Sequence, residues 1–129
     1  MILPCEIAVK SVVPAIKAVI AKELVETHSL KQIQVAEILG ISQSAVSKYT
    51  KQVRGHVIEI DNIKEIQPLI NSMITLLTDG PPKRAEFLNL FCQTCATIRK
   101  KGLMCQFCTK TDPRIKTEEC SFCLNCNTV

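Results

Sequence analysis

The chain has no tryptophan, and aromatic residues make up only 4% of its 129 residues. Its apolar content of 47% therefore rests mainly on Ile, Leu, Val and Ala, which suits the packing of small helices. Long apolar runs are also missing, because the longest charge-free one, residues 66–78, is too short to cross a membrane and carries Asn71 and Ser72. We expect a mainly α-helical protein that has no membrane partner.

Sequence motifs of catalysis are missing as well. The chain contains no P-loop, no glycine-rich nucleotide motif and no pattern that pairs a nucleophile with a base. Histidine is scarce, since only His28 and His56 occur, and both fit ordinary surface positions. We therefore expect that the protein is not an enzyme.

Cysteine, by contrast, is abundant: seven of the eight cysteines fall within residues 92–126. Residues 1–10 lack the basic start and apolar stretch of a signal peptide, so we expect a cytoplasmic protein, in which paired cysteines favour metal over disulfides. A C-x2-C pair lets two sulfurs converge on one ion, and two pairs supply the four thiolates of a tetrahedral site. The candidate metal ligands are Cys92, Cys95, Cys105, Cys108, Cys120, Cys123 and Cys126.

Two metals fit this pattern. The first two pairs would hold Zn²⁺ in a closed structural site, but their nine-residue spacer is short for a zinc ribbon and three cysteines stay unexplained. The C-x2-C-x2-C run of residues 120–126 resembles bacterial ferredoxins, which add a distant fourth cysteine to hold [4Fe–4S], although the ferredoxin proline is missing. The excess of thiols favours an iron–sulfur cluster, with zinc as the alternative. A metal-free disulfide switch and a mixture of cluster and zinc stay open.

Two other features bear on such a site. Arg99, Lys100 and Lys101 lie between the first two pairs and would offset the negative charge of a thiolate site, which is about −2. They equally fit an ordinary basic helix end. Cys5 lies far from the other cysteines and is interpreted either as a small buried apolar side chain or as a ligand supplied from the N-terminal segment, even across a dimer.

Apolar spacing predicts most of the helices. They cover residues 14–27, with Pro14 in the first turn, and 30–39, 43–52, 62–78 and 83–100, with a further helical segment at 5–12. Pro68 interrupts the pattern of 62–78, and residues 56–60 fit a short strand or a linker. From Leu103 onward we expect loops and turns organised by cysteines.

Residues 29–49, SLKQIQVAEILGISQSAVSKY, carry a helix-turn-helix signature. Ala36 is small where two helices would cross, and Gly40 suits the left-handed turn between them. Ser42 can cap the second helix. The small core is expected to contain Ile33, Leu39, Ile41 and Val46, with Ala45 and Tyr49 also facing inward.

The second helix of this motif enters the major groove of DNA with its N-terminal residues on the base edges. Gln43 can bond adenine with two hydrogen bonds, and the serines can serve bases or phosphates. The basic residues would meet phosphates, which add affinity rather than sequence choice. The candidate DNA contacts are Gln43, Ser44, Ser47, Lys48, Lys51 and Arg54. The net charge of +4 agrees, since residues 1–55 hold seven Lys or Arg against four Glu.

Two stretches, LPCEIAVKSVVPAIKAVIAKELVE and QVAEILGISQSAVSKYTKQVRG, resemble a family of archaeal helix-turn-helix transcriptional regulators akin to the lambda-repressor-like class. The resemblance covers residues 3–55 and extends more loosely over 91–108, where members have a C-x2-C followed by a second ligand pair, in some relatives with His where this chain has Cys108. It implies a sequence-specific DNA-binding regulator, dimeric, with DNA contacts at Gln43, Ser44, Ser47 and Lys48.

These observations predict three parts: a helix-turn-helix DNA-binding domain at 1–55, a connecting or dimerisation segment at 56–80, and a cysteine-rich metal- or cluster-binding domain at 81–129. The main hypothesis is a homodimeric regulator of transcription that binds double-stranded DNA and whose iron–sulfur cluster senses redox state, oxygen or iron. One alternative keeps the DNA-binding head above a structural zinc site. Another, of a different class, is an electron-transfer or metallo-adaptor protein whose helical part binds another protein.

Overall fold

The computed structural model describes residues 3–51, 58, 60, 62–79, 83–112 and 123 of the chain. This part is mainly α-helical, as the sequence predicts, and it contains no β-strand. Its helices are α1 (Pro4–Lys10), α2 (Val12–Glu26), α3 (Gln32–Leu39), α4 (Gln43–Thr50), the short 3-10 helix η1 (Lys64–Ile66), α5 (Gln67–Thr78), α6 (Arg84–Lys100) and α7 (Cys105–Thr111). The strand or linker expected at residues 56–60 lies largely outside the described residues, apart from Ile58 and Ile60, which are buried.

The N-terminal helical segment breaks at Ser11, three residues before the proline at which we expected a separation or kink. Pro14 explains the position, because its ring would clash with the carbonyl of the residue four places back, Lys10, which is the last residue of α1. Ser11 leaves the helical conformation at φ −126° and is buried, and its Oγ donates to the carbonyl of Ile7 at 2.7 Å. The hydroxyl is therefore satisfied inside the break.

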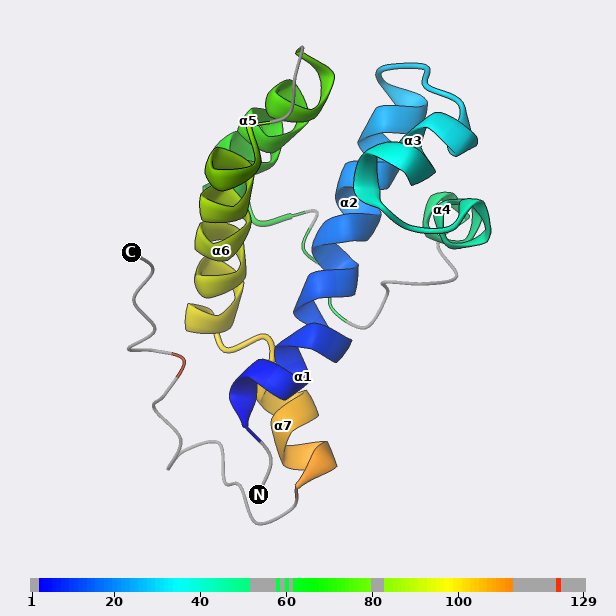
Figure 1. Ribbon diagram of the computed structural model, residues 1–129. Coiled ribbons are helices and arrows are strands. Elements are labelled where there is room, and N and C mark those ends of the chain that lie inside the picture. The colour runs from blue at the N-terminus through cyan, green and yellow to red at the C-terminus, as the bar shows by residue number, and fades with distance from the viewer. Residues whose placement is uncertain are drawn as a thin grey trace.

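Helix α2 forms the centre of the molecule (Figure 1), with α1 at its start and α3 and α4 on one side. Helices α5 and α6 lie side by side on its other side, and α7 lies beneath α1. Every helix except α7 makes substantial contact with α2 or with the α5–α6 pair, so one continuous apolar core joins the N-terminal and C-terminal helices.

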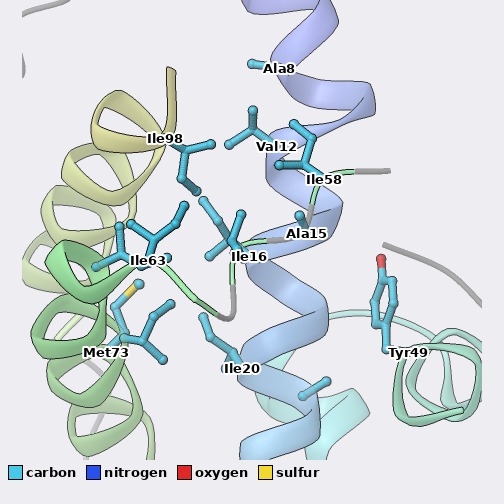
Figure 2. Packing of buried hydrophobic residues seen from close by; sticks show 14 of the residues in the cluster. Ala8, Val12, Ala15, Ile16, Ile20, Tyr49, Ile58, Ile63, Met73 and Ile98 are labelled. Carbon is cyan, nitrogen blue, oxygen red and sulfur yellow. The ribbon is translucent and has the colours of Figure 1, made fainter. Parts of the chain in front are cut away.

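The core is built from aliphatic side chains, as the composition predicts. Ile16, Ile20 and Leu24 of α2 are fully buried, and Figure 2 shows Ile16 and Ile20 facing Ile63 and Met73 from across the bundle. Ile98 of α6 closes the same layer near Val12. Burial of each such side chain is worth about 1.5–3 kcal/mol relative to exposure, so the centre of α2 stabilises the whole fold.

The prediction of the small core is wrong for one residue, Ile33. Ile33 was expected inside the small core between the two helices of the motif, but its side chain is 53% exposed. Helix α3 instead buries Val35 and Ala36, while Leu39 and Ile41 are half-buried. Helix α3 starts at Gln32, later than expected, and has only about two turns. So short a helix buries a narrow stripe of side chains, and Ile33 lies outside that stripe.

From residue 62 onward, the helices follow the prediction until the end of α6. Pro68 does not interrupt a helix, because it lies in the first turn of α5, where its missing N–H costs nothing. Gly102 closes α6 with φ +75°. The expectation of loops from Leu103 onward is wrong at residues 105–111, which form α7, where the N–H of Cys108 donates to the carbonyl of Met104 at 3.2 Å. Residues 113–122 and 124–129, to which the same expectation applies, lie outside the described residues. Met104 is fully buried and anchors this turn.

Candidate functional site

The link between α3 and α4 is built by two residues whose roles the sequence predicts. Gly40 adopts the left-handed conformation at φ +65°, and the N–H of Ile41 donates to the carbonyl of Ala36 at 3.0 Å. Ser42 then caps α4, its Oγ accepting from the N–H of Ala45 at 3.1 Å. The chain reverses within three residues, and the start of α4 is held without any charged group.

Helix α4 is divided sharply into two faces. Ala45, Val46 and Tyr49 are buried, and α4 packs against α2 and α3. The opposite face carries four of the predicted DNA contacts: Gln43, Ser44 and Lys48 are exposed, and so is Lys51, the residue after the helix. The protein therefore offers a firmly seated helix whose free face is polar and basic.

The remaining two predicted DNA contacts stand apart from this group. Ser47 is half-buried, and its carbonyl accepts from the Thr50 hydroxyl at 3.0 Å and from the N–H of Lys51 at 3.1 Å. The Ser47 side chain thus lies at the edge of the free face rather than at its centre. Arg54 falls outside the described residues.

The described cysteines are distributed over two helices and one isolated residue. Cys92 and Cys95 lie three residues apart on α6, as expected, with Cys92 exposed and Cys95 half-buried. Cys105 and Cys108 have the same spacing on α7, where Cys105 is half-buried and Cys108 buried. Spacing of i, i+3 puts each pair on one face of its helix. Cys120 and Cys126 lie outside the described residues, while Cys123 is described and buried.

Among the described residues, the basic side chain of Arg99 forms a hydrogen bond with a cysteine. It lies near the end of α6, is only 6% exposed, and its Nε–H donates to Cys123 Sγ at 3.5 Å. The sequence had left open whether Arg99 balances sulfur charge or is an ordinary basic helix end. A buried guanidinium beside a thiol favours the first interpretation for this residue, because a buried cation needs a polar or anionic partner.

Its two neighbours behave differently. Lys100 is exposed, and Lys101 Nζ donates to Glu65 Oε1 of η1 at 2.9 Å. This hydrogen bond from Lys101 lowers the pKa of the Glu65 carboxyl below its ordinary value of 4.5. Lys101 therefore ties the end of α6 to η1, and we assign it no part in balancing sulfur charge.

Cys5 is exposed, so the interpretation of this residue as a small buried apolar side chain is wrong. It lies in the first turn of α1, a helix too short to bury residues on every side, and its neighbours Ile7 and Ala8 take the buried face. Helix α1 packs against α7, the helix of Cys105 and Cys108 (Figure 1). The N-terminal segment thus lies beside one of the two cysteine-bearing helices.

The fit to a metal is incomplete within the described residues. All-sulfur donors suit both Zn²⁺ and an iron–sulfur cluster, and Arg99 supplies a balancing cation. Across the described ranges, however, no three Cys, His, Asp or Glu side chains gather closely enough to hold an ion. Since at most two described donors lie close together, a four-ligand site would need at least two more ligands from outside the described residues, such as Cys120 and Cys126.

Comparison of the chain with family models, with curated proteins and with solved structures finds no match. Among the described helices, none is long and apolar enough to cross a membrane.

Proposed function

We propose that the protein is a sequence-specific DNA-binding regulator of transcription that places α4 in the major groove. The observation that carries this proposal is the division of α4 into a buried apolar face and an exposed face with Gln43, Ser44 and Lys48. The short turn through Gly40 and the cap at Ser42 hold α4 across α3, as a helix-turn-helix requires. The resemblance of residues 3–55 to archaeal helix-turn-helix regulators supports the same conclusion.

Some of the exposed residues would contact bases and others would contact phosphates. Gln43 stands at the first position of α4, where a major-groove helix contacts bases, and its amide matches the donor and acceptor of adenine. Ser44 and Ser47 would bond bases or phosphates. Lys48, Lys51 and the undescribed Arg54 would meet phosphates, which supply affinity and orientation without sequence choice.

A dimer is part of the proposal, because two copies of α4 about 34 Å apart would contact successive turns of one DNA face. Residues 56–80, the segment proposed to connect or dimerise, include α5, which packs mainly against α6, also contacts α2 and leaves Asn71, Ser72 and Thr75 exposed. Such a dimer would bind a DNA site with two-fold symmetry.

The DNA-binding proposal is tested by selecting duplexes from a random pool. The affinity is then measured for the most enriched duplex and for a scrambled duplex of equal length. We expect one enriched sequence with two-fold symmetry and a preference over the scrambled duplex of about 10³-fold or more at physiological salt. Equal affinity for both duplexes would remove the regulator proposal and leave the metallo-adaptor alternative.

The second part of the proposal concerns the cysteine-rich segment of residues 81–129. We propose that it holds an iron–sulfur cluster of the [4Fe–4S] type, with Zn²⁺ as the alternative, through ligands drawn from Cys92, Cys95, Cys105, Cys108, Cys120, Cys123 and Cys126. The number of thiols and the buried Arg99 at Cys123 support a negatively charged sulfur centre here. When bound, a cluster would supply a redox- and oxygen-sensitive crosslink, whereas zinc would supply only a structural one.

Metal content and visible absorption of protein purified without oxygen test this part. About four irons with labile sulfide per chain and a brown colour that bleaches in air support the cluster, and a colourless protein with about one zinc supports the structural alternative. The sensing role is tested separately, by comparing operator affinity before and after removal of the metal. Unchanged affinity would end the sensing proposal and leave DNA binding untouched.

A further inference from the structure

An open pocket of about 490 Å³ lies where α2, α3, α5 and α6 meet. Its volume falls within the roughly 300–1,000 Å³ that is typical of small-molecule sites. The pocket is lined by neither α4 nor any of the described cysteines, so it is separate from the polar face of α4 and from those cysteines.

The walls of the pocket are apolar. Phe87 and Phe91 of α6 form a tilted aromatic pair with ring centroids 6.0 Å apart, and both line it. Ile38 of α3 and Leu88 of α6 contribute large side chains that are 36% and 47% exposed. Apolar side chains left in contact with water along a concave surface are typical of a ligand site.

The charged residues among the described lining of the pocket are all basic. Lys17 reaches it from α2, while Lys83 and Arg84 reach it from the beginning of α6. No Asp or Glu stands among the described residues that line the pocket, and none of these three cations forms a salt bridge within the described part of the chain.

Two of these cations lie at a helix end that disfavours positive charge. The N-terminus of a helix carries partial positive charge, so acidic side chains are preferred there and basic ones are disfavoured. Helix α6 has 17 residues and begins with Lys83 as its cap and Arg84 as its first residue, whereas its Glu86 does not line the pocket. The helix end and the three cations therefore add to one positive potential at the mouth of an apolar pocket.

We propose that this pocket binds a small amphipathic anion, an aliphatic or aromatic carboxylate. Its hydrocarbon part would lie against Phe87, Phe91 and Leu88, and its carboxylate would meet Lys17, Lys83 and Arg84. Charge complementarity favours this ligand over a neutral or cationic molecule of the same size. Such a ligand would contact α3, which carries α4, and the α5–α6 pair at the same time.

The test uses the full chain and decanoate below its micellar concentration, measured by isothermal titration calorimetry. Decanol and decyltrimethylammonium serve as neutral and cationic probes of equal chain length. We expect one decanoate per chain, bound at least about tenfold more tightly than either of the other probes. Equal affinity for the three probes, or several weak sites per chain, would overturn the proposal.

Charge-reversal variants locate the site. Lys17→Glu with Arg84→Glu should weaken decanoate binding by about tenfold or more, whereas Lys64→Glu, an exposed lysine of η1 outside the pocket, should leave it unchanged. Loss of the same size in Lys64→Glu would mean that only net charge matters, and the pocket proposal would fall.

A second copy of the chain is the competing occupant, and Leu88→Glu distinguishes it. This residue is half exposed, so the variant should fold, which circular dichroism verifies. We expect Leu88→Glu to lose decanoate binding and to keep the oligomeric state of the wild type in sedimentation. Dissociation of the oligomer by Leu88→Glu, with no decanoate binding in the wild type, would assign the pocket to self-association instead.

Discussion

Arg99 Nε–H donates to Cys123 Sγ at 3.5 Å, which joins the end of α6 to a cysteine 24 residues further along the chain. Both residues are buried, Arg99 at 6% and Cys123 at 7% exposure. A guanidinium is charged at any physiological pH, so its burial beside sulfur is most favourable when that sulfur carries negative charge. This pair is the strongest physical link between the described structure and a thiolate centre.

Arg99→Met tests that link, because it keeps an apolar stem of similar length and removes the cation. If the C-terminal cysteines hold metal, the variant should lose it to a chelator roughly tenfold faster than the wild type, since residues outside the ligand shell commonly change metal affinity by about 10–100-fold. Lys100→Met is the matched control, because Lys100 is the next residue of the same helix and is exposed. Equal rates of metal loss in both variants would contradict a role for Arg99 at the centre.

Gly40→Ala should destabilise the protein through the backbone alone. The φ of +65° is strained for any residue with a Cβ, while a Cβ at this position would meet nothing within 4 Å. We expect a loss of about 1–2 kcal/mol in the free energy of unfolding, measured by urea denaturation. Gly40→Asn should lose less, because asparagine tolerates this conformation. An unchanged midpoint for Gly40→Ala would mean that the turn adopts another conformation in solution.

The ion pair between Glu65 and Lys101 should make a small, pH-dependent contribution to stability. Its hydrogen bond lowers the pKa of Glu65 in the folded protein, so the contribution is present above the ordinary value of 4.5 and is lost as the pH falls through the lowered pKa. Glu65→Gln should therefore be less stable than the wild type at pH 7, and the difference should shrink as the pH falls below 4.5 toward pH 3.

The same comparison in 1 M salt serves as the control for this pair. Screening at that ionic strength, with a Debye length of about 3 Å, should shrink the pH 7 difference because both side chains reach solvent. A difference that persists at pH 3 and in high salt would point to packing or helix propensity rather than to the ion pair.

Local chemistry made the turn between α3 and α4 partly predictable from the sequence. Gly40 and Ser42 each affect only the few residues around them. The turn at Gly40 and the helix cap at Ser42 can therefore be predicted from residue type, and the structure contains both. Ile33 does not follow from local pattern, because whether it is buried depends on how far α3 extends and on which helix lies opposite. Its neighbour Val35 is buried in its place.

The C-terminal part was less predictable. Helix α7 has only seven residues, and its start is set by Gly102 and the buried Met104 rather than by a repeating apolar pattern. The cationic pocket gives no sequence signal at all, because Lys17 and Lys83 are brought together only by the packing of α2 against α6. Such sites depend on tertiary structure and become visible only with it.

If α4 reads the DNA sequence, two variants should differ in the ratio of their affinities for the selected and the scrambled duplex. Gln43→Ala should lower this ratio, because it removes a base contact. The loss in binding free energy should be about 1–3 kcal/mol at one base pair of the site. Lys51→Ala should weaken binding to both duplexes alike, lower the salt slope by about one and leave the ratio intact, because it removes a phosphate contact. A ratio that stays at the wild-type value in Gln43→Ala, or equal effects of both variants on both duplexes, would show that α4 does not read the bases.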